Sequence, residues 1–298
     1  MSGAGGLPLV VGVDGTEAGL RAVDWAADEA SLRGVPLRLV HASVWEHYEG
    51  VSLAQGAARP VEQVMAEARV DAAARRARER RPRLEVSAAV LAEEPARALL
   101  REGQYASALV LGSPDRGGVA GLLRGSIGVA VAGHAPCPVV VLRGGNRATA
   151  PGGSAARGRV VLGVGAGPAG SAAVRFALAE AGLRRVPLEA VRAWRARRPA
   201  GAGAGRSGQA VRVLEEALHD APSGIEVRLR AVEGSAPRAL VHASHEAGLL
   251  VVGARRRRGG SRLRPGRVDH TVLHRSACPV AVVPENAPGT WPAEDEDG

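Results

Sequence analysis

The stretch Leu9-Val-Val-Gly-Val-Asp-Gly-Thr-Glu-Ala-Gly19 recurs 151 residues later as Val160-Val-Leu-Gly-Val-Gly-Ala-Gly-Pro-Ala-Gly170. Two further stretches recur 141 residues apart. Ala108-Leu-Val-Leu-Gly-Ser113 returns as Leu249-Leu-Val-Val-Gly-Ala254, and Cys137-Pro-Val-Val-Val141 returns as Cys278-Pro-Val-Ala-Val282. Self-similarity at a fixed spacing indicates a repeated structural unit. The chain of 298 residues therefore holds two diverged copies of one unit.

The composition between and after the copies sets the expected boundaries. We expect the first repeat over residues 1–143 and the second repeat over residues 159–284. Residues 144–158 are rich in Ala, Gly and Ser, which is typical of a flexible linker. Residues 285–298 carry a cluster of acidic residues, which predicts a disordered acidic tail.

Apolar runs in the first repeat predict strands, and apolar residues at helical spacing predict helices between them. The expected elements in chain order are a strand at 9–13, a helix around 20–30, a strand at 37–42, a helix from 61, a strand at 84–90, a helix at 95–102, a strand at 108–111, a helix at 126–133 and a strand at 138–142. Strands that alternate with helices predict, in each repeat, a doubly wound, parallel, five-stranded α/β sheet covered on both faces.

The helix that starts at residue 61 has two contrasting faces in its sequence. One face, predicted to pack on the sheet, carries Val61, Val64, Met65, Ala68 and Ala72. The arginines between 75 and 83 alternate with acidic residues and predict a solvent-facing surface.

Charge is distributed unequally along the chain, whose formal net charge is +9. Residues 1–143 hold 16 Arg and 16 acidic residues, whereas residues 159–284 hold 21 Arg and 9 acidic residues. The run Arg255–Arg258 predicts either weak, phosphate-directed contact with polyanions or a solvated basic face. Aromatic residues make up only 2% of the chain, which argues against single-stranded nucleic acid as a partner, because such binding depends on base stacking.

Several classes of protein are disfavoured by simple counts. No apolar run is long enough for a membrane span, and Met1–Pro8 lacks the pattern of a signal peptide, so we expect a cytoplasmic protein. Cys137 and Cys278 each begin an apolar strand and are expected to be inert buried thiols. No Ser-His-Asp, Cys-His or paired-carboxylate arrangement follows from the spacing, and the histidines do not cluster as metal ligands, so neither a catalytic nor a metal site is predicted.

Two motifs follow strands whose carboxyl ends meet at one edge of the predicted sheet. Gly12-Val-Asp-Gly-Thr16 places a carboxylate after the first strand. Gly112-Ser-Pro-Asp-Arg-Gly-Gly-Val-Ala-Gly-Leu-Leu-Arg-Gly-Ser126 is a glycine-rich loop between a buried strand and a helix. Ligands of doubly wound folds bind at this edge. Glycines let backbone amides approach an anion, and a helix N-terminus favours negative charge.

With Ala135-Pro-Cys-Pro-Val-Val-Val141, these motifs resemble the universal stress protein family in its tandem two-domain form. The resemblance covers nearly the whole chain except the linker and the tail. It implies an adenine nucleotide alpha hydrolase-like, Rossmann-like fold and a stress-response module that binds ATP, with or without Mg²⁺. It also implies that the last strands of the two repeats pair, within one chain or in a homo-oligomer.

The same resemblance implies a set of nucleotide-binding residues, in which Asp14 would bind the ribose, Ala42 would flank the adenine and the glycine-rich loop would hold the phosphates. The set is Gly12, Val13, Asp14, Ala42, Leu111, Gly112, Asp115, Arg116, Gly117, Gly118, Gly125, Ser126 and Ile127.

The chain departs from the family pattern Gly-x2-Gly-x9-Gly-(Ser/Thr) while keeping its spacing. Asp115 stands where the family has its second Gly, and this carboxylate would repel a phosphate unless Arg116 or a metal ion offset it. In the second repeat Gly165 replaces the counterpart of Asp14, Arg256 replaces the second Gly, and Gly266-Arg267 replaces Gly125-Ser126. Nucleotide is therefore expected to favour the first repeat.

Three functions remain open on the sequence: a nucleotide-binding regulatory module, a slow ATPase and a nucleotide-free oligomeric scaffold. A further alternative for Asp14 is that it only caps the turn after the first strand.

Overall fold

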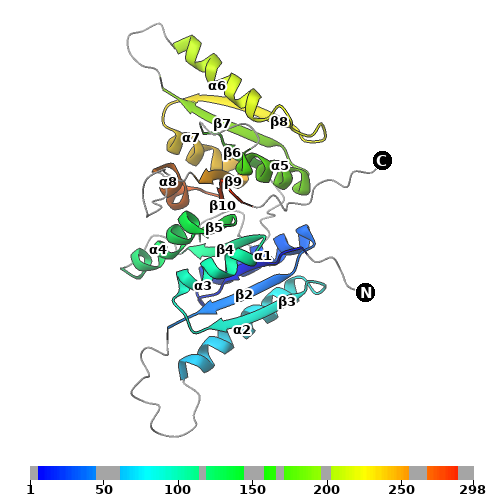
Figure 1. Ribbon diagram of the computed structural model, residues 1–298, viewed down its shortest axis with the longest axis vertical. Coiled ribbons are helices and arrows are strands. Elements are labelled where there is room, and N and C mark those ends of the chain that lie inside the picture. Colours follow the sequence, from blue (N-terminus) through cyan, green and yellow to red (C-terminus); the bar gives the residue numbers. More distant parts are fainter. Residues whose placement is uncertain are drawn as a thin grey trace. The chain divides into compact units, whose positions relative to one another are not determined.

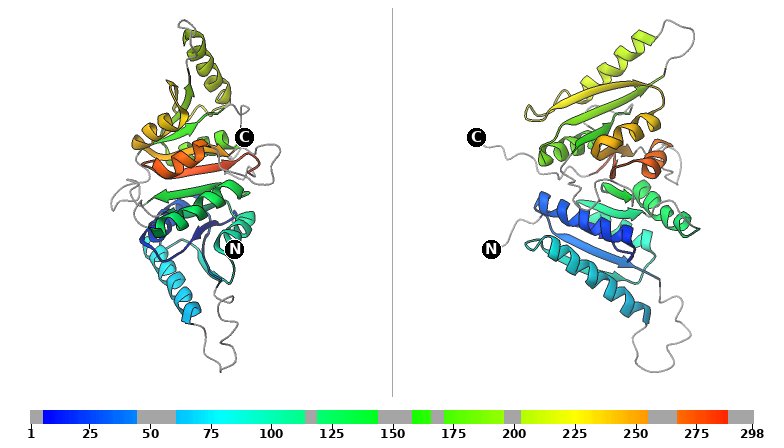
Figure 2. Two further views of the ribbon diagram at one scale, coloured as in Figure 1. Left: turned by 90° about the vertical axis from the view of Figure 1, so that its left-hand side faces the viewer. Right: turned by 180° about the vertical axis from the view of Figure 1, so that it is seen from behind.

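The computed structural model describes residues 6–44, 61–113, 119–143, 158–165, 171–195, 203–254 and 267–287 (Figure 1). The chain divides into two compact units, Met1–Cys137 and Pro138–Gly298, and each is an α/β structure (Figure 2). Most of the expected linker and acidic tail lies outside the described residues.

The first unit is a parallel sheet with helices against it. Its elements are β1 (Leu9–Gly12), α1 (Glu17–Arg33), β2 (Leu37–Ala42), α2 (Val61–Arg80), β3 (Val86–Leu91), α3 (Pro95–Glu102), β4 (Ala108–Ser113) and α4 (Val119–His134). The strands lie in the order β3-β2-β1-β4, and every pair is parallel. Helix α1 packs on β1 and β4, and α2 packs on β3 and beside α1, whereas α3 and α4 pack together. Right-handed crossovers put these two helix pairs on opposite faces of the sheet.

The order of strands creates a switch point in the first unit. From β1 the chain passes through α1 to β2 on one side, and it returns through α3 to β4 on the other side. The carboxyl ends of β1 and β4 are therefore neighbours where the winding reverses, which is where open α/β sheets bind ligands. The centre of the sheet is apolar, with Leu9, Val11 and Leu109 fully buried.

The second unit repeats this arrangement. Its elements are β5 (Val139–Arg143), β6 (Arg159–Gly163), α5 (Ala172–Arg184), β7 (Leu188–Trp194), α6 (Gly203–Ala217), β8 (Val227–Glu233), α7 (Ala236–Ala243), β9 (Ala247–Ala254), α8 (Arg267–Arg275) and β10 (Val280–Pro284). Strands β6 to β10 form the expected five-stranded parallel sheet in the order β10-β9-β6-β7-β8. The predicted fold class is thus confirmed. No helix among the described residues is long and apolar enough to cross a membrane.

Strand β5 is the last strand of the first repeat in sequence, yet it belongs to the second compact unit. It pairs with β10 in an antiparallel ladder in which Val139 lies opposite Val282 and Val141 lies opposite Val280. The two last strands therefore pair as the sequence analysis expected. This ladder covers an edge of β10 that would otherwise leave backbone donors and acceptors unpaired.

The buried face of α2 differs from the predicted one, and that prediction was wrong. The helix buries Ala66, Val70, Ala73, Ala74 and Ala77. Of the residues predicted to be buried, the three large ones are exposed, with relative accessibilities of 73% for Val61, 48% for Val64 and 50% for Met65. Small side chains allow the helix to approach its neighbours closely. The positions of the large apolar residues therefore did not predict the packing face of this alanine-rich helix.

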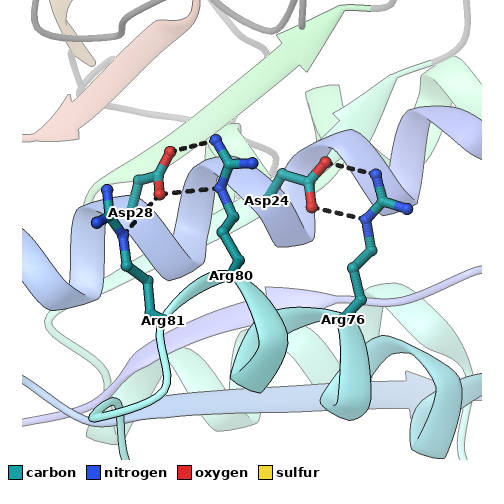
Figure 3. A network of polar contacts seen from close by, with 5 residues as sticks. All are labelled: Asp24, Asp28, Arg76, Arg80 and Arg81. Atoms are coloured by element: carbon teal, nitrogen blue, oxygen red, sulfur yellow. Dashed lines mark hydrogen bonds and ion pairs between the residues drawn. The ribbon is translucent and has the colours of Figure 1, made fainter. Parts of the chain in front are cut away.

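The arginines between 75 and 83 are exposed, as predicted, and three of them also form ion pairs with α1, namely Arg76 and Arg80 of α2 and Arg81 directly after it (Figure 3). Arg76 donates to both carboxylate oxygens of Asp24, each at 2.6 Å. Asp28 accepts two bonds from Arg80, at 2.7 and 2.9 Å, and one from Arg81 at 2.9 Å. The side-chain hydrogen bond to Asp28 raises the pKa of Arg80, and the bond to Asp24 raises that of Arg76. This network joins α1 to α2.

Replacing Asp28 by Asn is expected to lower the stability of the chain by up to about 1 kcal/mol, the usual scale for partly exposed ion pairs. The loss should shrink as salt is added, because mobile ions screen such pairs. Urea unfolding at low and high salt measures both effects. Asp71→Asn, at an exposed position of α2, is the matched control. Equal losses for Asp28→Asn and Asp71→Asn would contradict a role for the network.

Candidate functional site

Asp14 follows β1 at the switch point of the first unit, and its carboxylate is held by the turn that comes next. Oδ1 accepts a bond from the backbone N–H of Thr16 at 2.9 Å and another from the Thr16 hydroxyl at 2.7 Å. No hydrogen bond from the described residues reaches Oδ2. The carboxylate is therefore fixed in orientation, exposed, and left with one oxygen to accept from a ligand.

The turn that fixes Asp14 also starts α1. Thr16 is the N-cap of the helix, and its hydroxyl oxygen accepts a bond from the backbone N–H of Gly19 at 3.1 Å. Gly15 has a φ of 76°, a left-handed conformation that favours glycine. The hydrogen bonds from Thr16 to Asp14 and from Gly19 to Thr16 together cap the N-terminus of α1. Asp14 does cap the turn, as the simpler interpretation held, but this role uses only one of its oxygens.

Gly112 lies where the end of β4 passes the first turn of α1, and the approach is too close for a side chain. A Cβ atom at this position would lie 2.4 Å from the carbonyl oxygen of Ala18 and 2.7 Å from the backbone nitrogen of Gly19. All of these neighbours are backbone atoms, which cannot move aside as a side chain can. Gly112 therefore brings the carboxyl end of β4 against the N-terminus of α1, next to Asp14.

The other predicted residues of these strands line the same edge. Val13 is buried, and its N–H donates to the carbonyl of Val40 at 2.8 Å. Leu111 is buried at the end of β4, and Ala42 is half-buried at the end of β2. Gly12 is held against Leu111, whose Cδ2 would lie 2.9 Å from a Cβ at this position. The structure thus places these residues at the ends of three adjacent strands.

The glycine-rich loop is described only in part, and its helix begins earlier than expected. Asp115, Arg116, Gly117 and Gly118 lie outside the described residues. The helix predicted over 126–133 is present, but it is longer than predicted, because α4 starts at Val119 and not at Ser126. Ala120, Leu122, Leu123 and Arg124 are good helix formers, and they extend the helix through the tolerated glycines at 121 and 125. Gly125 and Ser126 therefore lie within α4, directly before the half-buried Ile127.

Two residues that the sequence analysis did not assign to the site lie at its edge. His41 is buried at the end of β2, and its Nδ1 lies 2.6 Å from the carbonyl oxygen of Val13. Because a carbonyl only accepts, Nδ1 carries the proton in this contact. Arg69 of α2 lies over the turn, with its Cδ 3.0 Å and its Nε 3.2 Å from where a Cβ of Gly15 would stand. Nothing in the sequence distinguishes Arg69 from the other arginines of the chain, so it could not be assigned to the site in advance.

Neither cysteine of the chain is activated, and Asp14 has no metal-binding partners among the described residues. Burial raises the pKa of both Cys137 and Cys278 to about 12, which keeps the thiols protonated and agrees with their predicted inertness. Across the described ranges, no group of three His, Cys, Asp or Glu residues is arranged to hold a metal ion. Asp14 alone supplies a carboxylate there and does not make a Mg²⁺ site by itself.

The corresponding edge of the second unit has different residues. Gly165 stands at the position of Asp14, and no atom of the described residues lies within 4 Å of the point that a Cβ would occupy there. Arg192 stands at the position of His41 and donates through Nη1 to the carbonyl of Val164 at 3.4 Å and also to that of Gly165. Arg255–Arg258, with Gly266, lie outside the described residues, and Arg267 begins α8. The carboxylate has been lost and a guanidinium has been gained.

A family model described as "Universal stress protein family" matches the chain twice, over residues 8–143 and 156–284. A universal stress protein of Mycobacterium tuberculosis (strain H37Rv) is 40% identical over 309 aligned positions, which cover 96% of this chain and 99% of that protein. Another protein of that name from the same strain is 41% identical over 138 residues. That match spans 46% of this chain and about half (45%) of the relative's length.

Solved structures agree on the fold. A universal stress protein from Archaeoglobus fulgidus DSM 4304 matches with a TM-score of 0.69 at 17% identity, covering 93% of this chain and 98% of that chain. Two single-repeat matches, with TM-scores of 0.34 and 0.36, are universal stress proteins in complex with dAMP, from Archaeoglobus fulgidus, and with cAMP. They are 26% and 23% identical, and they cover 45% and 47% of this chain and 96% and 98% of their own chains.

Proposed function

The chain belongs to the universal stress protein family in its tandem form, and from this premise we propose that its first unit binds an adenine nucleotide, ATP in particular, as a regulatory module of the cytoplasm. The observation that carries the proposal is the carboxylate of Asp14. It is oriented by Thr16 through one oxygen, and it keeps the other at the switch point of the sheet. A pair of vicinal hydroxyls, as in ribose, is a donor that suits this acceptor.

The remaining site residues would contact different parts of the nucleotide. Ala42, at the end of β2, would flank the adenine, and the loop from Gly112 to Ser126 would hold the phosphates. Gly112 keeps β4 close to the first turn of α1, so backbone amides of that turn lie beside the start of the loop. Arg69, over Gly15, supplies a cation on the same side. Two solved members of the family are complexes with adenine nucleotides, dAMP and cAMP.

We assign no catalytic residue, and the module is proposed to sense or carry nucleotide without turning it over efficiently. Asp14 and Asp115 are the carboxylates that would meet a Mg²⁺ ion brought in with ATP. Replacing Asp115 by Gly would restore the family pattern and remove a charge that repels phosphate.

The test is to identify nucleotide that stays with the purified full-length protein by mass spectrometry, and then to titrate nucleotide-free protein with ATP by calorimetry. We expect one ATP per chain, in the first unit, and no phosphate release above a blank. Saturable ATP binding with clear phosphate release would support the slow ATPase instead. No retained nucleotide and no heat of binding would leave the nucleotide-free scaffold.

A further inference from the structure

We propose that the second unit carries an anion site of its own, centred on the guanidinium of Arg192 at the carboxyl end of β7, and that its ligand is a small phosphate-bearing molecule. The site is independent of the nucleotide site proposed for the first unit. It lies at the equivalent edge of the second sheet, where the residues have changed from acidic to basic.

The position of Arg192 follows from the strand register. Gly163 of β6 pairs with Val191 of β7, so Arg192 lies one residue beyond the last paired residue of β6. Its Nη1 reaches back across this end to the carbonyls of Val164 and Gly165. His41 makes the same contact in the first unit, to the carbonyl of Val13. The side chain at this position thus contacts the equivalent backbone carbonyl in both units, but it is an imidazole in the first unit and a guanidinium in the second.

The anchoring contact leaves most of the guanidinium for a ligand. An arginine has five N–H donors in a planar fork, and Arg192 uses only Nη1 for the two carbonyls. Among the described residues, no acceptor is found for its Nε and Nη2. These two groups form the edge that binds a phosphate through two parallel hydrogen bonds. Because the backbone already holds Nη1, the half-buried side chain loses little freedom when a ligand binds.

No carboxylate competes for this edge. Arg192 has no ion pair with any described residue, and Gly165 has removed the acid that the first unit carries at the neighbouring position. Segments 166–170, 196–202 and 255–266 follow β6, β7 and β9, and their sequences contain no Asp or Glu. In the first unit the corresponding segments, 15–19, 45–51 and 114–125, contain Glu17, Glu46, Glu49 and Asp115. The loss of acidic residues therefore holds in the sequence of all three segments.

Two further cations lie at the carboxyl end of β7. Arg195 directly follows β7, and Arg206 of α6 donates to its carbonyl oxygen at 3.2 Å. Neither residue has an ion pair within the described part of the chain. Glu233 ends the adjacent strand β8 opposite Trp194, but it forms no ion pair with these arginines. Three cations against one unpaired acid favour a ligand with more than one negative charge, which a phosphate group supplies near neutral pH.

The same residues argue against a nucleotide held as in the first unit. Without a carboxylate at position 165, the second unit lacks an acceptor for ribose. A ligand recognised here is bound through its phosphate, whether the phosphate is free or part of a larger molecule. Inorganic phosphate is therefore the simplest probe, and pyrophosphate and AMP distinguish a free anion from a phosphate monoester.

The experiment is calorimetric titration of the full-length protein with inorganic phosphate. We expect saturable binding that weakens roughly tenfold in Arg192→His, which restores the residue of the first unit, and in Arg192→Gln, on the scale of a lost charge-assisted bond. Gly165→Asp should weaken it similarly by placing a carboxylate beside the guanidinium. A Cβ at position 165 meets no atom of the described residues within 4 Å.

Two controls separate this site from general charge and from the first unit. Arg97→Gln removes one positive charge from α3, where the side chain is 82% exposed, and should leave phosphate binding unchanged. Arg192→Gln should leave the ATP affinity of the first unit unchanged, so a failure of the nucleotide proposal can be told apart from a failure of this one. The inference is overturned if Arg192→Gln binds phosphate as the wild type does, if Arg97→Gln weakens binding equally, or if only duplex DNA and no small phosphate binds.

Discussion

Replacing Asp14 by Asn is expected to weaken ATP binding by about 1–3 kcal/mol, which raises the dissociation constant roughly 5- to 150-fold. The physical reason is specific to the geometry of the turn. The amide oxygen of Asn can still accept from the N–H and hydroxyl of Thr16, so the start of α1 is preserved. The oxygen offered to the ligand becomes an NH₂ group, which donates and carries no negative charge. Calorimetry with ATP measures the change.

This substitution separates the two roles of Asp14. Asp14→Ala removes both oxygens and should lower stability as well as affinity, because Thr16 loses its acceptor. Asp220→Asn makes the same change of charge at an exposed position of the second unit and should affect neither quantity. If Asp14→Asn bound ATP as tightly as the wild type, Asp14 would be a turn cap only, and the assignment of the site would fail.

Gly112→Ala is expected to lower the stability of the chain by about 1–3 kcal/mol, the usual cost of forcing an extra methyl group into a close-packed place. The new Cβ would stand 2.4 Å from the carbonyl oxygen of Ala18, so β4 and α1 would have to separate. The separation would also move Asp14 and the loop apart and weaken nucleotide binding. Urea unfolding and an ATP titration of the same variant measure the two losses.

The repeat supplies a matched control for this prediction. Gly253 is the counterpart of Gly112 in the second unit, but among the described residues a Cβ there meets only the Cβ of Ala173, at an ordinary contact of 3.4 Å. Gly253→Ala should therefore change stability by no more than about 0.5 kcal/mol. If the two variants were equally stable, the close approach at Gly112 would have no energetic weight.

The sequence predicted the order of the elements because each strand is a short apolar run and the repeat shows every run twice. The strand Leu37–Ala42 and the helix Pro95–Glu102 have the predicted bounds. The packing face of α2 could not be predicted, because its alanines look alike from either side and only tertiary contacts decide between them. The ion pairs of Asp24 and Asp28 with arginines 52 or 53 residues away are likewise invisible to local patterns.

Sequence comparison of the two repeats identified Asp14 and Gly112, since motif spacing marks strand ends. It did not reveal why Gly112 is required, which depends on the distance between β4 and α1. His41 and Arg192 were not predicted as counterparts that anchor the same carbonyl position, because a histidine and an arginine share no sequence pattern. The start of α4 was misplaced because glycines at 121 and 125 suggested a loop.

The ladder between β5 and β10 has a practical consequence for anyone who dissects this protein. A fragment of residues 159–284 follows the repeat in the sequence, but it omits β5 and leaves β10 with a bare edge at Val280 and Val282. Such an edge recruits strands from other molecules, so the fragment should self-associate or precipitate during purification. A fragment that begins at Pro138 keeps its own covering strand. The separable piece that contains the second repeat is therefore longer than the second repeat itself.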